Sequence, residues 1–234
     1  MVKDKKPNLV FLMETKSSAK RMKRVRVQLG FEHMLVVDCV GKSGGLALLW
    51  MSESEVEIQN YSCQHINAKV RSSPTASMWK LIGFYGQPDA SKRMESWNLL
   101  RYLARMDPTP WVCFGDFKEI LSPDEKFGGN GCQMTLEECG LSELEYTGPK
   151  FTWNNKQDGT AFIKERLDRV VANREWCGAY PNVEVVVGAA ICLNHSPLMV
   201  YMDGLGRTVR RPHNFKFEVG WELHQKCHQI IEES

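Results

Sequence analysis

The 234-residue sequence lacks the markers of several common protein classes. Its eight cysteines form no CxxC pair and no cysteine–histidine set at zinc-finger spacing, so a zinc finger or a thioredoxin-like motif is not indicated. No apolar run reaches the ~18–20 residues needed to cross a bilayer. A signal-peptide pattern is also lacking, because residues 1–7 are charged and the apolar run at 9–13 is short. These absences predict a protein of the nucleus or cytoplasm that is not secreted and has no membrane partner.

An excess of one charge is lacking over the whole chain but present locally. The sequence has 30 lysines and arginines against 28 aspartates and glutamates, and its 43% of hydrophobic residues is ordinary for a globular protein. Within residues 1–30, however, nine basic side chains accompany only Asp4 and Glu14. A second basic stretch lies at residues 207–216. Such blocks either attract phosphate backbones or form solvated helix faces, and both interpretations stay open.

Short apolar runs bounded by turn residues predict many strands and few helices. Strands are expected at residues 8–13, 33–40, 46–50, 55–61, 65–70, 78–85, 111–114, 151–153, 166–171, 184–187 and 197–202. Helical spacing is expected at residues 17–29 with Gly30 as C-cap, at 91–106, briefly at 136–139, and at 217–231. No repeat or linker precedes about residue 203, which predicts one domain over 1–202 and a basic connector with a helix over 203–234. A strand-rich domain favours two packed sheets with helices outside them.

Polar side chains lie at or near the ends of several predicted strands, where a rigid sheet can position functional groups. The candidates are Glu14, Tyr85, Asp116, Asp168, Asn194 and His195. Carboxylates hold Mg²⁺, a histidine can move a proton, and a tyrosine can steady a phosphate. Taken singly, each carboxylate has an alternative role as a turn or cap residue, and His195 as a hydrogen-bonded structural histidine. The ordered set as a whole is less readily explained that way.

At these positions the sequence resembles the endonuclease/exonuclease/phosphatase superfamily. The motifs that carry the resemblance are Met13-Glu14-Thr15, Gly83-Phe84-Tyr85-Gly86, Gly115-Asp116-Phe117, Arg166-Leu167-Asp168 and His195-Ser196-Pro197. Residues 40–50, 150–155 and 162–169 look like one subgroup, the apurinic-type endonuclease domain of plant non-LTR (LINE-like) retrotransposons. The resemblance covers roughly residues 8–202, and the tail is similar to the connector toward the reverse transcriptase.

The resemblance implies a fold and a chemistry. The fold is α/β, a four-layer α-β-β-α sandwich of two mostly antiparallel sheets with the active site at one end. The residue matching Glu14 holds Mg²⁺ or Mn²⁺, the one matching Asp116 orients or deprotonates water, and the one matching Tyr85 contacts phosphate. The residue matching Asp168 pairs with the one matching His195. The implied partner is DNA, cleaved at a phosphodiester while the metal neutralises developing charge, and no small-molecule cofactor is implied.

Three departures from the family pattern predict weak or absent activity. The family begins with a strand that carries a site asparagine, and this sequence starts after it, so we expect the sandwich to lack its first strand. Lys118 stands where the family's Gly-Asp-x-Asn motif has asparagine, and its positive charge should weaken Mg²⁺ binding. Asn194 replaces the aspartate of the family's Ser-Asp-His-Ser motif. Loss of one such group commonly costs ~10²-fold or more in rate.

The sequence therefore predicts a Mg²⁺-dependent DNA endonuclease or phosphodiesterase-like domain of retrotransposon origin that is impaired or inactive. An active endonuclease is one alternative. A second is a catalytically dead relic that still binds nucleic acid through its basic surfaces. A third, a small-molecule phosphatase of the same superfamily, fits less well because the subgroup-like segments point to the transposon branch.

Overall fold

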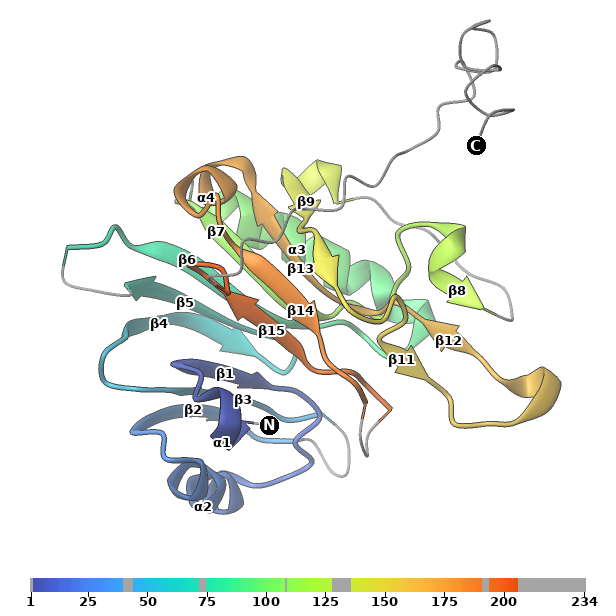
Figure 1. Ribbon diagram of the computed structural model, residues 1–234, viewed down its shortest axis with the longest axis horizontal. Helices are drawn as coiled ribbons and strands as arrows, with labels where there is room; N and C mark the ends of the chain where they lie inside the picture. The colour runs from blue at the N-terminus through green and yellow to red at the C-terminus, as the bar shows by residue number, and fades with distance from the viewer. Residues whose placement is uncertain are drawn as a thin grey trace, which may run out of the picture. The chain divides into compact units, whose positions relative to one another are not determined.

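The computed structural model describes residues 2–39, 44–71, 75–107, 109–127, 136–190 and 194–205 (Figure 1). The chain divides into two units, Met1–Gly204 and Leu205–Ser234, and the first carries all the described helices and strands. The helix expected at residues 217–231, and most of the expected connector, lie outside the described residues. No described helix combines the length and apolar character that crossing a bilayer requires.

The largest sheet has six strands in the order β4-β5-β6-β7-β13-β9. Their bounds are β4 Glu55–Ser62, β5 His65–Arg71, β6 Trp79–Tyr85, β7 Trp111–Asp116, β13 Asp168–Asn173 and β9 Leu141–Glu143. All neighbours in this sheet are antiparallel except β6 and β7. The helix α3 (Arg93–Met106) lies between β6 and β7 in the chain and supplies the crossover that a parallel pair needs.

A second layer packs on this sheet and consists of two three-stranded sheets, in the orders β1-β3-β2 and β10-β14-β15. Their bounds are β1 Leu9–Leu12, β2 His33–Val37, β3 Leu46–Trp50, β10 Tyr146–Thr147, β14 Glu184–Val187 and β15 Leu198–Tyr201. Among the described residues no strand pairs with the free side of β1 or of β15, so the second layer is divided in two. A small sheet in the order β11-β12-β8 lies beside these layers, with β8 Lys126–Phe127, β11 Trp153–Asn154 and β12 Lys164–Glu165.

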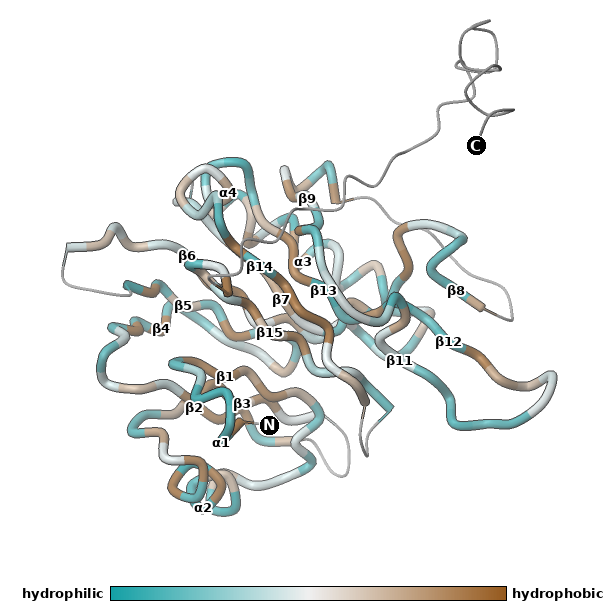
Figure 2. Tube along the Cα trace, viewed as in Figure 1, coloured by the Kyte–Doolittle hydropathy of each residue, from teal (hydrophilic) through white to brown (hydrophobic). Residues whose placement is uncertain are grey.

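Two apolar clusters hold the layers together. One lies between the six-stranded sheet and the second layer and includes Leu48, Ile66 and Val185. The other lies between the opposite face of the six-stranded sheet and α3 and includes Ile82 and Leu100. Figure 2 shows apolar colouring along β7 and β14, whereas the part of the β11–β12 loop that follows β11 is hydrophilic. The buried apolar side chains of both sheet faces are therefore the main source of cohesion.

Helices form the two outer layers of the sandwich. The predicted helix at residues 17–29 is α2 (Ala19–Leu29), which contacts β2 (Figure 1). It ends at the predicted C-cap, Gly30, whose φ of 85° is left-handed. The unpredicted α4 (Arg174–Ala179) is capped by the Asn173 side chain, which accepts the N–H of Trp176. The remaining short helices are α1 Val2–Lys5, η1 Ala90–Lys92, η2 Pro123–Glu125, η3 Glu137–Cys139 and η4 Gly159–Ala161. The predicted α/β sandwich of mostly antiparallel sheets is confirmed.

Two predicted boundaries near the candidate residues were wrong. The strand expected at residues 166–171 is β13, which begins at Asp168 and continues to Asn173. The backbone N–H groups of Leu167 and Asp168 donate to the hydroxyl oxygen of Thr152, over 3.0 and 2.9 Å, and this local bonding precedes the sheet ladder. The strand expected at 111–114 extends through Asp116. Asp168 therefore starts a strand and Asp116 ends one.

Candidate active site

Three neighbouring strands bring three candidate side chains to one level of the six-stranded sheet. The parallel register places Tyr85 opposite Asp116, and the antiparallel register places Asp168 opposite Asp116. Because β6 and β7 end at this level while β13 begins there, the three side chains share one end of the sheet. Asp116 and Asp168 are only 1% and 2% exposed, so neither carboxylate is hydrated and each needs a partner inside the protein.

Two glycines allow the close approach of backbones that positions this end of the sheet. Gly115 has a φ of +142°, and a Cβ there would lie 1.9 Å from the carbonyl oxygen of Phe84. A Cβ on Gly83 would lie 2.5 Å from the ring of Phe11, so glycine there lets β1 lie against β6. The chain that leaves β1 is thereby held beside the end of β7, where the Met13 sulfur lies 3.2 Å from the Asp116 nitrogen.

Glu14 directly follows this contact and reaches into the site. Its Oε1 accepts a hydrogen bond of 2.7 Å from the Tyr85 hydroxyl and lies 3.3 Å from the Lys118 ammonium. Its Oε2 lies 3.5 Å from the ammonium of Lys16. Burial raises the pKa of Glu14, but the Tyr85 hydrogen bond and the Lys118 charge outweigh burial, so the net pKa is lowered. The pKa of Tyr85 is raised by burial and by its bond to Glu14.

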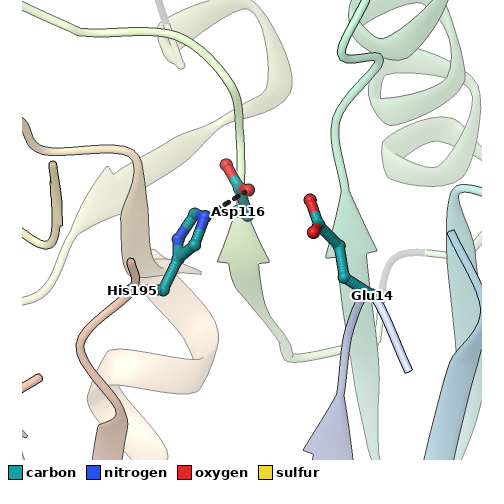
Figure 3. Close-up of side chains that lie close together, drawn as sticks. All are labelled: Glu14, Asp116 and His195. Carbon is teal, nitrogen blue, oxygen red and sulfur yellow. Dashed lines mark ion pairs between the residues drawn. The ribbon is translucent and has the colours of Figure 1, made fainter. Parts of the chain in front are cut away.

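His195 pairs with Asp168 on the other side of Asp116. Its Nδ1 lies 2.8 Å from Asp168 Oδ2. Its Nε2 lies 3.6 Å from Asp116 Oδ2 (Figure 3). An isolated antiparallel bridge between the backbones of His195 and Trp153 helps to fix the position of the His195 main chain. Burial lowers the pKa of His195, but the hydrogen bond and charge of Asp168, with the charge of Asp116, raise it above the ordinary value. The site therefore favours the protonated imidazole.

The Lys118 side chain lies between two carboxylates of the site. Its ammonium is 2.5 Å from Asp116 Oδ2 and 3.3 Å from Glu14 Oε1, and it stands 5.0 Å from the centre of the Tyr85 ring. Its backbone has a left-handed φ of 58°, which lets the Lys118 N–H donate to the other oxygen of Asp116 over 3.0 Å. Burial opposes the charged form, yet the charges of Asp116 and Glu14 outweigh it and raise the pKa of Lys118. The pKa of Asp116 is raised by burial and by Asp168, against the opposite effects of Lys118 and His195.

Thr152 positions the Asp168–His195 pair and was not among the sequence candidates. Its hydroxyl oxygen accepts the N–H of Asp168, and its carbonyl accepts the N–H of Ser196 over 2.7 Å. At 1% exposure it is shielded from bulk solvent. The residue lies in the family-like segment at 150–155, but no periodicity or spacing marks a position that braces two distant segments.

Asn194 behaves differently from the other candidates. It is exposed, and its carbonyl oxygen accepts the N–H of Asn154 over 3.2 Å. Its side-chain amide makes no hydrogen bond with any residue that the structure describes. The structure thus brings together the side chains of Glu14, Tyr85, Asp116, Lys118, Asp168 and His195 but does not bring the Asn194 side chain into their network.

The site contains a donor set for a divalent cation, but an ammonium already uses part of it. One ligand atom each of Glu14, Asp116 and His195 lies within 4.8 Å of the others (Figure 3). Two carboxylate oxygens and an imidazole nitrogen suit Mn²⁺, and the oxygens suit Mg²⁺. The ammonium of Lys118 pairs with both carboxylates, so a metal ion and the ammonium compete for the same oxygens. In the present arrangement the ammonium occupies oxygens that a divalent cation would need, so such an ion can bind only when Lys118 turns away.

Comparison with known proteins gives a match of fold without a match of sequence. The sequence matches no protein-family model and no curated protein. Among solved structures, an AP endonuclease from Archaeoglobus fulgidus is similar with a TM-score of 0.61 and 16% identity, over 86% of this chain and 91% of that one. The 3′ phosphatase NExo from Neisseria, bound to a product DNA hairpin, gives a TM-score of 0.58 at 14% identity, over 83% and 88%.

A third similar structure is the endonuclease domain of TRAS1, a telomere-specific non-LTR retrotransposon. Its TM-score is 0.57 at 14% identity, over 83% of this chain and 97% of that one. TM-scores of 0.57–0.61 establish the fold, but identities of only 14–16% do not establish the activity, which has to be argued from the site. The resemblance expected from the motifs is confirmed at that level: the chain has the endonuclease/exonuclease/phosphatase fold.

Proposed function

We propose that residues 1–202 are a nuclease-like domain, of retrotransposon origin and of the plant LINE-like kind that its motifs resemble, which binds DNA and whose cleavage is impaired. The observation that carries the proposal is the Lys118 ammonium, which pairs with both Glu14 and Asp116 where the cation of a metal-dependent phosphodiesterase would bind. Support for the nuclease class comes from the similar structures, which include an AP endonuclease and a retrotransposon endonuclease domain.

The residues of the site have separate roles in the proposed phosphodiester cleavage. Asp168 fixes the orientation of His195 and favours its charged form, which can hold a negative oxygen or pass it a proton. Asp116, with a raised pKa, is suited to accept a proton from water once Lys118 releases it. The Tyr85 hydroxyl can donate to a phosphate oxygen when it is not donating to Glu14. Asn194 stands where the family pattern has a carboxylate, and its side chain lies outside this network.

Mg²⁺ or Mn²⁺ is the ion we propose for this site, with weak binding. When bound, such an ion neutralises charge on the phosphate. The ammonium must first leave both carboxylates, and at an effective dielectric of about 20 a like charge ~4 Å away costs about 4 kcal/mol. Calorimetric titration should therefore show Mg²⁺ binding to Lys118→Asn that is at least ~10²-fold tighter than binding to the parent chain. Equal affinities would show that the ammonium moves aside without cost.

Nicking of supercoiled plasmid, with Mg²⁺ and with Mn²⁺, tests the proposal as a whole. The parent chain should nick no faster than His195→Ala. Lys118→Asn/Asn194→Asp removes the ammonium and keeps a residue that tolerates the left-handed backbone. It also returns the family's carboxylate at the position that precedes His195 in the sequence. It should nick at least ~10²-fold faster than the same protein carrying His195→Ala. Robust nicking by the parent would contradict impairment.

The second candidate is a catalytically dead relic that still binds nucleic acid. The same ion pairs favour it, because they neutralise the site without any ion from solution. It predicts that Lys118→Asn/Asn194→Asp binds the plasmid and leaves it intact with either metal, an outcome that would exclude residual cleavage chemistry.

A further inference from the structure

We infer that the outer face of α2 is a nucleic-acid contact surface separate from the Glu14–His195 site. Within 11 residues α2 carries five basic side chains and no acidic one. The inference rests on the proposed function for its partner, nucleic acid, and is independent of whether the site cleaves. It concerns the exposed cations Lys20, Arg21 and Arg24, with Lys23 beside them.

The cations of α2 have no ion-pair partner among the residues that the structure describes. On α3, by contrast, Arg93 lies 3.3 Å from Glu119 and Arg101 lies 2.5 Å from Glu138. Across the described ranges, no ion pair is formed by any basic residue of α2, namely Lys20, Arg21, Lys23, Arg24 and Arg26. Their positive charge is therefore available to a partner. An array of free cations on an exposed helix attracts a polyanion, because binding releases the counterions condensed on its phosphates.

Three of these basic residues line an open hollow along the helix. Its volume is about 560 Å³, and its described lining is Ser18, Lys20, Arg21, Arg24, Val25 and Gln28. Residues three and four apart share one side of a helix, so Arg21, Arg24 and Gln28 project in the same direction. Three cations, a hydroxyl and an amide are the groups that proteins use to hold a phosphate backbone.

The apolar side of α2 is already packed on the domain, which favours nucleic acid over a membrane as the partner of this helix. Met22 is 3% exposed, Val25 and Leu29 are half-buried, and the helix contacts β2. A helix that lies in a bilayer interface needs a free apolar face, and this one is already packed on the domain. Val27, at 64% exposure, is the one large apolar side chain of α2 that is exposed. The charged face is therefore suited to a hydrated polyanion.

The helix is fixed relative to the site by the segment that joins them. Thr15 and Lys16, which follow Glu14, donate their N–H groups to the carbonyls of Gly45 and Gly44 over 3.1 Å. The N–H of Ala19 donates to Asp38 Oδ1 over 2.8 Å, which anchors the first turn. A phosphate backbone held on α2 would therefore keep a constant position relative to Glu14.

A charge-neutralised helix tests the inference on the full chain. Lys20→Gln/Arg21→Gln/Arg24→Gln replaces the cations that line the hollow with good helix formers. The probe is a fluorescently labelled DNA duplex, titrated at several salt concentrations. The salt dependence, log K against log[salt], should become shallower by ~2–3, and the affinity at ~0.1 M salt should fall at least ~10-fold. The control Lys92→Gln/Arg105→Gln/Arg174→Gln changes the net charge equally on exposed residues of other elements and should shift the slope by less than ~1.

The outcomes separate this inference from the proposed function. Equal losses in the two triple variants would overturn it, because net charge alone would then explain binding. Undiminished DNA binding by the α2 variant, with lost binding to vesicles of anionic phospholipid, would assign the helix to membranes and also overturn it. If DNA binding depends on α2 but the Lys118→Asn/Asn194→Asp variant does not nick plasmid, the inference about α2 is supported and the proposed cleavage function is contradicted. If the Lys118→Asn/Asn194→Asp variant nicks plasmid but DNA binding does not depend on α2, the proposed function is supported and the inference about α2 is contradicted.

Discussion

The two halves of the candidate site balance their charges by different means. On one side, Asp168 pairs with His195, and Thr152 holds both segments through backbone hydrogen bonds. On the other side, Glu14 and Asp116 share the ammonium of Lys118. The first half contains a group that can exchange a proton, because the partner of its carboxylate is a histidine, whose pKa is raised by Asp168. The second half is neutralised by a permanent cation of the chain.

This difference concerns how the protein stabilises the buried carboxylate of Asp116 and how that stabilisation limits metal binding. Asp116 is 1% exposed and lies beside Asp168, so its ionised form requires a cation. A dissociable ion would satisfy that need only when bound. The Lys118 ammonium satisfies it at all times, at the expense of left-handed backbone at both Lys118 and Glu14, with φ values of 58° and 47°. Structural stability and metal binding thus compete for one position.

The largest expected effect follows from removing the permanent cation. Lys118→Met leaves the buried carboxylate of Asp116 without its counter-ion and should lower the free energy of unfolding by ~3–5 kcal/mol at pH 7. Lys16→Met is the matched control, because Lys16 pairs with Glu14 at 3.5 Å but its side chain is 58% exposed, and it should cost less than ~1 kcal/mol. Urea unfolding measures both. Millimolar Mg²⁺ should restore part of the loss in Lys118→Met alone; equal effects of the two substitutions would refute the comparison.

The next effect is a change of stability with pH, and it follows from comparing His65 with His195, the two described histidines that are not exposed. His65 is 5% exposed, its Nδ1 lies 2.8 Å from the Ser62 hydroxyl, and its Nε2 lies 2.7 Å from Asn60 Oδ1. Burial lowers the pKa of His65 to about 4, whereas that of His195 is raised. Because the folded state prefers neutral His65, its contribution is complete above pH ~6.5 and is lost as the pH falls from there toward 4.

The size of that loss is of the order of 2–3 kcal/mol between pH 7 and pH 4, at 1.36 kcal/mol per unit of pKa. Urea unfolding of the parent and of His65→Gln over this range isolates it, since the variant lacks the titrating ring. If both proteins lose stability in parallel as the pH falls, His65 is not held in its neutral form.

Many of the strands and the end of α2 could be predicted from the sequence, because apolar runs and capping glycines depend only on neighbouring residues. The apolar runs predicted β1, β3, β5 and β6 within a few residues, and Gly30 marked the end of α2. The strand ends also pointed to Tyr85 and Asp116. Strand order is a non-local property, however, and no spacing in the chain reveals that Asp168 lies opposite Asp116 in the register.

The contacts of the site depended still more on tertiary structure. The charge of Lys118 was visible in the sequence, and its repulsion of a metal ion was expected from it. Its simultaneous contact with Glu14 and Asp116 requires the left-handed backbone at Lys118 and the packing of Phe11 on Gly83, which brings β1 alongside. Thr152 escaped notice because a lone threonine beside aromatic residues has no chemical signature until two distant segments converge on it.

The smallest expected effect concerns the hydroxyl that links Tyr85 to the permanently neutralised half. Tyr85→Phe removes the 2.7 Å hydrogen bond to Glu14, a net contribution of ~0.5–1.5 kcal/mol, while Lys118 continues to hold the carboxylate. Tyr201→Phe is the control, because its hydroxyl contacts only the Met199 sulfur at 3.7 Å among the described residues, and it should change stability by less than ~0.5 kcal/mol.

A double-mutant cycle of Tyr85→Phe with Lys118→Met then measures whether the two donors to Glu14 act together. We expect a coupling of at least ~0.5 kcal/mol in urea unfolding, since each donor limits the cost of losing the other. Additive effects would mean that Glu14 is held by Lys118 and Tyr85 independently, and the second half of the site would then be two separate contacts and not one neutralised unit.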